Sequence, residues 1–532
     1  MKAKYIDYEE THCFPATAIR YLHQEASLKP FINQFPTLDH FKKIIAERKF
    51  NGNRSQLVEV LNQQYQNIPN LPALLQSNIA SLKEDQTFTI TTGHQLNIFT
   101  GPLYFIFKIV TAINLAKQLQ KENPAQKFVP VYWMATEDHD FEEINHTYIG
   151  GKRIHWQTAA TGATGRILTQ TILNALKEYK GVLGISIHAE KLASIVTQAY
   201  TQYPNLADAT RFLVNALFGD YGLVVIDADN AQLKQQFATI IEQDIIQQNS
   251  YSSISKSSEA LALLNIHAQV NPREINFFYL LDELRERIVF EQGEYQVLNS
   301  DIVFTEADLK AEIHAHPERF SPNVVMRPLY QEVILPNLAY VGGGGELAYW
   351  LQLKANFDFY KVDFPILILR NSAMLSDEKT ALQLEKLGLN FSTIFEKTEA
   401  LKNAFVLKNS LQALHIQTEW KQFESVFDTL KERVNQIDST LKPSTEAVAV
   451  RLKKALSNLE KKMLKAEKRN FVDALQTIEN IKSQLFPGGG LQERKENFGL
   501  YYVKYGDDFI AHLIHHFDPL AFKFTIIYSW HS

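Results

Sequence analysis

Cysteine and long apolar runs are the two features that this sequence of 532 residues most clearly lacks. Its one cysteine, Cys13, cannot form a disulfide within the chain, which is typical of proteins in the reducing cytoplasm. No stretch approaches the ~20 consecutive apolar residues of a membrane helix. The first lysines, Lys2 and Lys4, are not followed by an apolar run, so we expect no signal peptide. These absences predict a cytoplasmic protein that does not bind membranes.

A strong charge of either sign is also missing. The 54 basic and 59 acidic residues give a formal net charge of -5, which does not indicate a broad basic face for nucleic acid. Hydrophobic residues make up 45% of the chain and charged residues 21%, the composition of an ordinary globular protein. A chain of this length exceeds what one hydrophobic core normally supports, so we expect two or three domains.

Strand-like and helical segments alternate in a way that predicts an α/β core. A β-branched run at 88–92 is followed by a helical stretch at 103–120 and a nearly continuous apolar run at 128–135. Strand, crossover helix and buried strand form the βαβ unit of a parallel sheet. Apolar runs at 223–226 and 365–369 also end in polar residues. The pattern predicts a Rossmann-like sheet, whose ligands bind beyond the carboxyl ends of the strands.

Changes in pattern divide the chain into segments. Within the core, the stretch at 274–290 predicts either a hairpin or a strand–helix unit. We expect an N-terminal helical segment at 1–85 that packs on the core, a Rossmann-like core at 86–390 with an inserted subdomain at about 230–345, a helical coiled-coil domain at 391–486 and a segment at 487–532 that returns to the core.

Apolar residues at alternating spacings of three and four indicate a coiled coil. The seam runs through Val426, Leu430, Val434, Ile437 and Leu441, resumes after Pro443 at Val448, Leu452, Leu456, Leu459 and Met463, and continues at Leu475, Ile478, Ile481 and Leu485. A proline between two such helices favours an antiparallel hairpin, and a pair of amphipathic helices packed on the core is the alternative. Such a seam buries best against a second copy, so we expect a homodimer.

The first candidate cluster lies where the strand at 88–92 ends and the next helix begins. It holds Gly93, His94 and Gln95, followed by Thr100-Gly101-Pro102-Leu103-Tyr104. Glycine lets the backbone approach a ligand, and free N–H groups at a helix start attract anions. The Gly-His pair resembles the loop that holds ATP phosphates in nucleotidyl transferases and class I synthetases, although the phosphate-loop and dinucleotide glycine patterns are both missing. A plain connecting turn is the alternative.

The second cluster, Glu137-Asp138-His139-Asp140, follows the apolar run at 128–135. Such a carboxylate–histidine set can orient an amine, hold Mg²⁺ or act as a general base. His139 has the unperturbed pKa that suits a base, Asp138 and Asp140 are candidates to fix its tautomer or bind an ammonium group, and His94 is a candidate to stabilise phosphate or oxyanion charge. The alternative is a solvated loop that caps a helix. A zinc site is not favoured, since no cysteine is near.

The third cluster surrounds four consecutive glycines, Gly342 to Gly345, that precede Glu346 and a helix. Their backbone donors are suited to a carboxylate or phosphate, and a flexible hinge is the alternative. Arg327 stands upstream and can pair either with a substrate carboxylate or with Glu332 in a structural ion pair. The sequence leaves both possibilities open.

Taken together, these stretches resemble the BshC family, the proposed cysteine ligases of bacillithiol synthesis. The pieces that carry the resemblance are 93–108 with its Phe-Thr-Gly-Pro-Leu-Tyr core, 133–145 with Glu-Asp-His-Asp-Phe-Glu-Glu-Ile-Asn, 327–350 and 491–497, in that order along the chain. Two positions depart from the family pattern: His94 stands where glutamine is usual, and Gly344 where proline is common.

The resemblance implies a Rossmann-like core with inserted connecting segments and a C-terminal α-helical coiled coil that makes a homodimer. It also implies the addition of L-cysteine to the glucosamine amine of glucosaminyl-malate, which forms an amide and gives bacillithiol. Condensation of an amine with a carboxylate in water is uphill, so ATP or ADP is an expected cofactor, while Mg²⁺ is left open. A nucleotidyl transferase or hydrolase on the same core and a non-catalytic coiled-coil scaffold are the alternatives.

Residues of the three clusters and of the strand end after 365–369 make up the expected site. The catalytic residues are His139, Asp138, Asp140 and His94, and the substrate-binding residues are Gly93, Gln95, Thr100, Gly101, Tyr104, Lys108, Glu137, Arg327, Gln331, Gly342, Gly343, Gly344, Gly345, Glu346, Tyr349 and Arg370, with no metal ligand among them.

Overall fold

The computed structural model describes residues 2–528 and separates into two compact units. The first unit comprises the chain up to residue 374 together with residues 490–527, and the second comprises residues 375–489. None of the helices in the described part of the chain has the length and apolarity needed to cross a membrane.

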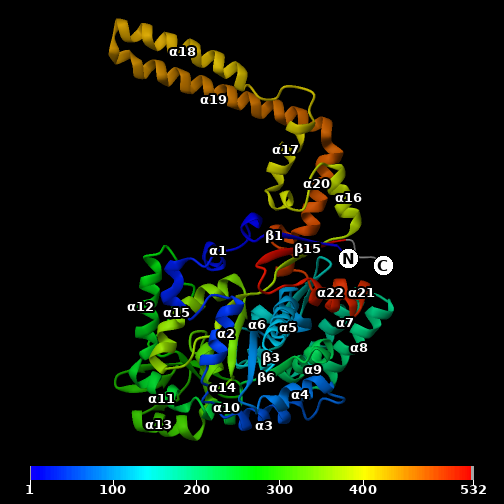
Figure 1. Cartoon of the computed structure of the whole chain (residues 1–532), viewed down its shortest axis with the longest axis vertical. Coiled ribbons are helices and arrows are strands. Elements are labelled where there is room, and N and C mark those ends of the chain that lie inside the picture. The colour runs from blue at the N-terminus through cyan, green and yellow to red at the C-terminus, as the bar shows by residue number, and fades with distance from the viewer. Residues whose placement is uncertain (1, 529–532) are drawn as a thin grey trace. The chain divides into compact units, whose positions relative to one another are not determined.

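A five-stranded parallel sheet lies at the centre of the first unit (Figure 1). Its strand order is β13 (Ile366–Leu369), β12 (Asn337–Gly342), β2 (Thr87–His94), β3 (Lys127–Met134) and β6 (Val224–Asp227). The crossover from β2 to β3 is α5 (Tyr104–Glu122), which packs along both strands. All four apolar runs that predicted core strands lie in this sheet, so the predicted Rossmann-like class is confirmed. The subdomain predicted as an insertion at 230–345 contains β12, but β12 pairs with β2 and β13 and is therefore a strand of the core sheet.

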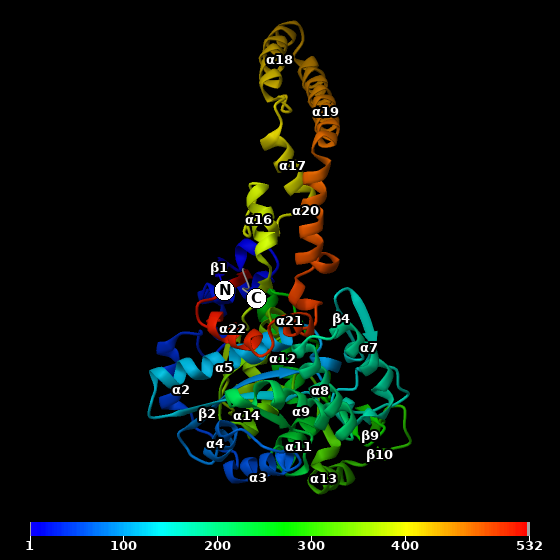
Figure 2. The ribbon, with the colours of Figure 1, turned by 90° about the vertical axis from the view of Figure 1, so that its right-hand side faces the viewer.

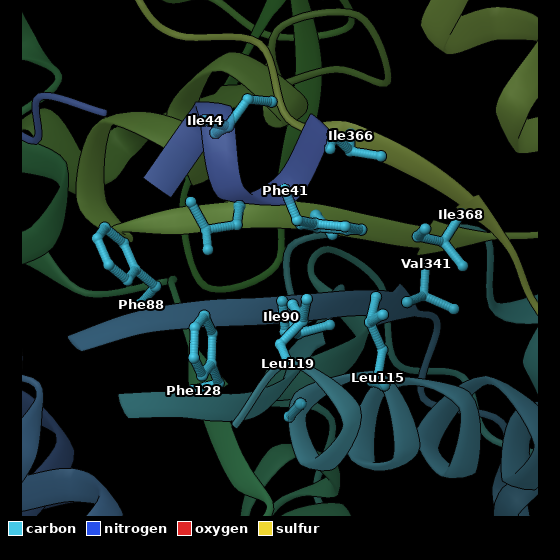
Figure 3. Close-up of a cluster of buried hydrophobic side chains, with 14 residues drawn as sticks. Phe41, Ile44, Phe88, Ile90, Leu115, Leu119, Phe128, Val341, Ile366 and Ile368 are labelled. Atoms are coloured by element: carbon cyan, nitrogen blue, oxygen red, sulfur yellow. The ribbon is translucent and has the colours of Figure 1, made fainter. Parts of the chain in front are cut away.

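Apolar side chains on one face of the sheet pack against two helices (Figure 3). Residues two apart on a strand point to the same face, and Phe88 and Ile90 on β2 join Ile366 and Ile368 on β13 in this way. Phe41 of α2 (Leu38–Glu47) and residues of α5 cover them. Complete burial of such a side chain stabilises the fold by about 1.5–3 kcal/mol. This core holds the strand ends in place.

The other elements of the first unit surround the sheet. A short hairpin joins β4 (His146–Ile149) to β5 (Lys152–His155). The helices not named above are α1 (Ala16–Leu22), α3 (Arg54–Tyr65), α4 (Ala73–Ser81), α6 (Phe141–Ile144), α7 (Leu173–Leu183), α8 (Ile187–Gln202), α9 (Leu206–Phe218), α10 (Ala231–Gln235), α11 (Ala238–Gln247), α12 (Asn249–Ala262), α13 (Glu306–Ala315), α14 (Arg327–Ile334), α15 (Gly344–Tyr360), α21 (Gly499–Tyr505) and α22 (Asp508–His516).

The region between β6 and β12 forms a second, antiparallel sheet. Its order is β10 (Val303–Phe304), β9 (Glu294–Val297), β8 (Arg285–Glu291), β7 (Phe277–Leu280) and β11 (Phe320–Pro322). β7 pairs antiparallel with β8, so the hairpin predicted at 274–290 is confirmed and the strand–helix alternative is wrong.

The first element of the chain is a strand, β1 (Lys2–Asp7), where the sequence predicted helix from the start. β1 belongs to a three-stranded sheet with the order β1, β15 (Lys523–Tyr528) and β14 (Ala373–Leu375). Its partner β15 stands more than 500 residues away in the sequence. A local pattern does not reveal a strand whose hydrogen bonds come from so distant a segment.

The second unit is helical. Its elements are α16 (Glu378–Lys386), α17 (Thr398–Asn409), α18 (Gln417–Ile437), α19 (Lys442–Glu467) and α20 (Val472–Leu485). α18 and α19 lie side by side (Figures 1 and 2) as an antiparallel pair, with Pro443 in the first turn of α19. The predicted antiparallel hairpin is confirmed, but its seam does not extend to residue 485. α20 is a separate helix that packs on α17 and buries Leu475, Ile478, Ile481 and Leu485.

Candidate active site

A cavity of about 990 Å³ opens at the carboxyl ends of the parallel strands. The residues after β2, β3, β6, β12 and β13 all contribute to its wall, which is where ligands bind in open α/β sheets. The antiparallel sheet forms another part of the wall through residues of β7 and β8. The predicted residues that line this cavity are Gly93, His94, Gln95, Tyr104, Lys108, Glu137, Asp138, His139, Asp140, Arg327, Gly343, Gly344, Gly345, Glu346, Tyr349 and Arg370.

Thr100, Gly101, Gln331 and Gly342 do not line the cavity. Thr100 and Gly101 have φ angles of 71° and 63°, and Asn497 Nδ2 donates to the Gly101 carbonyl at 2.8 Å. A Cβ at Gly101 would lie 2.6 Å from the Cβ of Asn97, so this turn requires glycine. These two residues shape the turn into α5, as the structural alternative for this cluster expected. The carbonyl of Gly342 accepts the backbone N–H of Arg370 at 2.8 Å.

Buried Lys108 and partly exposed Glu346 form an ion pair in the lining of the cavity, with Nζ and Oε2 2.6 Å apart. Lys108 also donates to the carbonyl of Gly93 at 2.8 Å, while Glu346 accepts from Tyr340 Oη and from the Gly343 backbone, each at 2.8 Å. Burial opposes the ionised form of Glu346, but Lys108 and these hydrogen bonds hold its pKa below the ordinary value. The pair joins the end of β2 to the start of α15.

His94 is uncharged at neutral pH. Burial, with the positive charges of Lys108 and Arg370, lowers its pKa well below the ordinary value. Its ring contacts those of Tyr104 and Phe105, at centroid distances of 5.2 and 5.4 Å. Its Nε2 atom is buried without a hydrogen-bond partner among residues 2–528. A neutral imidazole here is suited to donate to a ligand atom, because only a ligand can satisfy that nitrogen.

Arg370 is held by a buried carboxylate. Its Nη2 lies 2.7 Å from Oε1 of Glu493, and both side chains are almost fully buried. Nη1 donates to Ser372 Oγ at 2.8 Å, and the guanidinium carbon lies 5.2 Å from the centre of the Tyr104 ring. Removing one partner of such a pair costs about 3–5 kcal/mol. Arg370 therefore has a structural partner as well as a place in the cavity wall.

His139 contacts Arg285, a residue that the sequence did not predict as its neighbour. Its Nδ1 lies 2.5 Å from Nη1 of Arg285 on β8. A guanidinium only donates, so Nδ1 accepts and the proton of the neutral ring sits on Nε2. Burial and Arg285 lower the pKa of His139, against the opposing effect of Asp138 and Asp140. In this arrangement the lone pair of Nδ1 is occupied and Nε2 carries the proton, so the geometry favours a donor through Nε2–H, and the general-base role stays a prediction.

Glu137, which the sequence placed among the binding residues, has the properties of a proton acceptor. Burial raises its pKa to about 7, with Lys234 opposing and Asp229 adding to the rise. Its Oε1 accepts from Lys234 Nζ at 2.5 Å, and the lysine side chain is fully buried behind it. A carboxyl group with a pKa near 7 is matched to proton transfer at neutral pH.

A second carboxylate with a raised pKa, Asp227, lies at the end of β6. Burial and the neighbouring Asp229 raise the pKa of Asp227 to about 6. Thr136 Oγ1 donates to it at 2.5 Å, and Asp229 is held by Arg166 at 2.8 Å. Within residues 2–528, no group of three or more His, Cys, Asp or Glu side chains is arranged to hold a metal ion.

The glycine segment begins α15. Gly343 is the N-cap, and its backbone N–H donates to Glu346 of the same first turn. A Cβ at Gly344 would lie 3.0 Å from Cδ of Pro15, whereas a Cβ at Gly345 would meet open space. Gly345 is exposed in the cavity wall. The first turn of this 17-residue helix thus contributes to the cavity wall, where the helix dipole favours an anion.

Several basic residues of the site were not predicted from the sequence. Arg273, Arg285 and Arg287 come from the antiparallel sheet and the loop before it, and Arg494 comes from the C-terminal segment. Arg285 and Arg287 are two residues apart on β8 and therefore share one face. Arg273, Arg287 and Arg494 form no salt bridge with any described residue. The only sequence signal for Arg285 and Arg287 was their spacing of two residues in a segment for which a hairpin was one of the two predictions.

Comparison with known proteins identifies both units. The family model described as the N-terminal Rossmann-like domain of bacillithiol biosynthesis BshC matches residues 1–371, and the C-terminal coiled-coil domain of the same family matches residues 373–529. A protein of Flavobacterium psychrophilum named "Putative cysteine ligase BshC" is 45% identical over 98% of this chain and 98% of its own length. Proteins with the same name from Flavobacterium johnsoniae and Christiangramia forsetii are 45% and 40% identical, over 98% and 99% of this chain and 99% of each relative.

A solved structure titled as an arginyl tRNA synthetase of Campylobacter jejuni covers 87% of this chain and 98% of its own, at 12% identity and a TM-score of 0.23, too low to bear on the function. The family models and the curated relatives agree over nearly the whole length. The chain belongs to the BshC family of bacillithiol biosynthesis.

Proposed function

We propose that this chain joins the carboxyl group of L-cysteine to the glucosamine amine of glucosaminyl-malate, with formation of an amide and release of bacillithiol. The family description and the name shared by its relatives support the pathway and a cysteine ligase. The observation that carries the proposal is one cavity that holds both anion-binding groups and a buried carboxyl with a pKa of about 7. The reaction needs both, because its substrates are anionic and its nucleophile is an amine.

In the proposed reaction, the amine nitrogen forms a C–N bond with the carbonyl carbon of activated cysteine. The leaving group departs with the bonding electron pair, and the proton of the amine passes to Glu137. Lys234, fully buried behind Glu137, keeps part of the charged form available at neutral pH. His139 donates through Nε2–H, with its tautomer fixed by Arg285.

Activation of the cysteine carboxyl requires a driving reaction, and a nucleotide of the ATP or ADP class remains our proposal for it. Arg273, Arg287 and Arg494 of the cavity wall, which form no salt bridge within residues 2–528, fit an anionic ligand of this kind. The nucleotide would supply a phosphate leaving group for the carboxyl. We assign no metal to a protein-held site.

We further propose that the second unit forms a homodimer through α18 and α19. Neither helix buries a residue in the chain described, and both leave apolar side chains exposed, such as Val426 at 56% and Val448 at 52%. A coiled-coil seam of this kind is stabilised when a second copy covers it. The cytoplasmic location stays a prediction from the sequence.

The direct test is a thiol profile of cells that lack this chain, together with an assay of the purified protein. Loss of bacillithiol and accumulation of glucosaminyl-malate are the expected results, and both should reverse when the gene is restored. A normal thiol profile would contradict the proposal. The scaffold alternative leaves the cavity and its charged lining without a role, and it predicts no stabilisation by cysteine, glucosaminyl-malate or a nucleotide.

A further inference from the structure

Arg327, the first residue of α14, has a guanidinium that its own protein satisfies only in part. Nη1 donates to Oε1 of Gln331 at 3.0 Å. Nη2 is buried and has no hydrogen-bond partner among the described residues, and Arg327 is one of the residues that line the cavity. The side chains of Tyr340, Tyr349 and Glu346 are also near the guanidinium. The ring centres of Trp133 and Tyr340 each lie 5.6 Å from its guanidinium carbon. A buried N–H group of a charged side chain without an acceptor is costly, so its place in the wall requires an explanation.

The sequence left open whether Arg327 pairs with Glu332, and the structure shows that Gln331 stands between them. Nε2 of Gln331 donates to Oε1 of Glu332 at 2.9 Å. Because a guanidinium only donates, the amide of Gln331 is oriented with its oxygen toward Arg327 and its nitrogen toward Glu332. Gln331 is 0% exposed and Glu332 2% exposed, so water does not compete with this contact.

Glu332 is fixed in turn by two further buried groups. Nδ2 of Asn337 donates to its Oε1 at 2.7 Å, and Nη2 of Arg48 donates to its Oε2 at 3.1 Å. The hydroxyls of Thr89 and Thr91 on β2 donate to Oδ1 of Asn337 at 3.1 and 2.8 Å. The hydrogen bonds thus converge on the Glu332 carboxylate, which accepts from the sheet side through Asn337 and from the Arg327 side through Gln331, and each link sets the orientation of the next.

We propose that Arg327 is the anion-binding residue on the floor of the cavity, and that Gln331 and Glu332 are positioning residues that leave its Nη2 group for a carboxylate or phosphate of the ligand. The hydrogen bond from Nη1 to Gln331 fixes the plane of the guanidinium. Nη2 then presents its hydrogens to the cavity from a fixed position. The inference rests on the proposed function only for the identity of the ligand.

The surroundings of Arg327 fit an oxyanion. A Cβ at Gly93 would lie 3.6 Å from Nη1 of Arg327 and 3.2 Å from Oη of Tyr340, so glycine keeps this part of the floor open. His94, the next residue, has the other buried nitrogen of the cavity wall without a partner in the described chain, Nε2. A planar guanidinium and an imidazole donor beside an open glycine are the groups that carboxylate and phosphate recognition uses.

Binding to the purified full-length chain tests the anion site directly. Thermal stabilisation and calorimetry use four probes: L-cysteine, L-cysteinamide, L-malate and inorganic phosphate. The amide of cysteine lacks the carboxylate, so a difference between the first two assigns the anion to cysteine, while binding of malate or phosphate assigns it to the other sources. We expect at least one anion to bind and its affinity to fall about tenfold or more in Arg327→Met, as for a charge-assisted hydrogen bond.

The positioning role is tested with a matched pair of glutamines. Gln331→Met removes the acceptor of Arg327, and Gln352→Met removes another buried amide, on α15 and outside the cavity, that bonds Ser258 and Val270. Both variants should lower the melting temperature. Only Gln331→Met should weaken the anion that Arg327 binds, about three- to tenfold, and raise the KM of the substrate that carries it with little change in kcat.

Three outcomes would overturn the inference. If no anion stabilises the wild type, or if Arg327→Met binds the anion as well as the wild type, Arg327 is not the anion-binding residue. If Gln331→Met and Gln352→Met have the same affinity for the anion, the positioning role is wrong. A protein that binds an anion through Arg327 but forms no amide from cysteine and glucosaminyl-malate would instead refute the proposed function and leave this inference standing.

Discussion

Replacement of Glu137 by glutamine is the perturbation that the site geometry makes most informative. The amide keeps the shape of the side chain but accepts no proton from an amine. Loss of a positioned general base lowers turnover by roughly two to four orders of magnitude. Because burial raises the pKa of Glu137 to about 7, kcat/KM of the wild type should rise with pH. About a tenth of the groups are ionised at pH 6 and about nine-tenths at pH 8, so the expected rise across this window is about ninefold.

The assay measures amide formation between pH 5.5 and 8.5 for the wild type, Glu137→Gln and Lys234→Met. Lys234 is the cation that favours the charged form of Glu137, so its loss should move the inflection to higher pH. Asp244→Asn is the control, because Asp244 is a buried carboxylate of α11 outside the cavity. It should change stability and leave the pH profile unchanged. Turnover of Glu137→Gln within tenfold of the wild type would refute the reasoning.

Stability gives an independent check on the same group. The pKa of Glu137 is higher in the folded chain than its ordinary value, so its contribution to stability is fully present below that ordinary value and is lost as pH rises through about 7. Relative to Glu137→Gln, the wild type should therefore become less stable between pH 5 and pH 8. A difference in melting temperature that stays constant over this range would show that the pKa is not raised.

Further variants test the remaining roles. His139→Asn should lower turnover by less than Glu137→Gln, because it removes a donor and not the proposed base. If His139→Asn lost more turnover than Glu137→Gln while Arg285→Met kept the wild-type turnover, His139 would again be the better candidate for the base. Gly345→Val should weaken an anionic ligand measured by calorimetry without lowering the melting temperature, since its Cβ meets open space. His94→Gln should keep turnover within about tenfold, as an amide also donates a hydrogen bond. Light scattering should give about twice 61.0 kDa, and Val426→Glu should reduce it to the monomer; a monomeric wild type would contradict the dimer.

The parallel sheet was predictable because its strands carry their signal locally. β3 is buried from Phe128 to Met134, and its sequence there is accordingly a nearly continuous apolar run. The helix α5, which follows β2, has apolar residues at helical spacing. The strand β1 was missed for the opposite reason. Its partner β15 lies at the other end of the chain, and no local pattern encodes that pairing. The early end of the coiled coil was missed because the apolar spacing of three and four resumes in α20, after the turn at 468–471.

The acidic side of the site was predictable and the basic side was not. Carboxylates and histidines that follow buried strands must gather at one edge of a parallel sheet, so the order of the strands was not needed to place Glu137, His139 and Glu346 in one cavity. Arg285 and Arg287 reach the same cavity from an antiparallel sheet, whose position over the strand ends is a matter of tertiary packing. His139 was therefore identifiable from its residue type and position, but its partner Arg285 was not.

That missing partner decides the chemistry of His139. The unperturbed pKa of histidine suits a general base, and this was the reason for assigning the role from sequence. One hydrogen bond from Arg285 occupies the lone pair on Nδ1 and places the proton on Nε2, which makes the ring a donor. Glu137, in contrast, has an ordinary pKa too low for this task, and burial beside Asp229 raises it into range. In the mechanism that we propose, the environment exchanges the two roles, so residue type alone is a poor guide to which group of such a cluster accepts the proton.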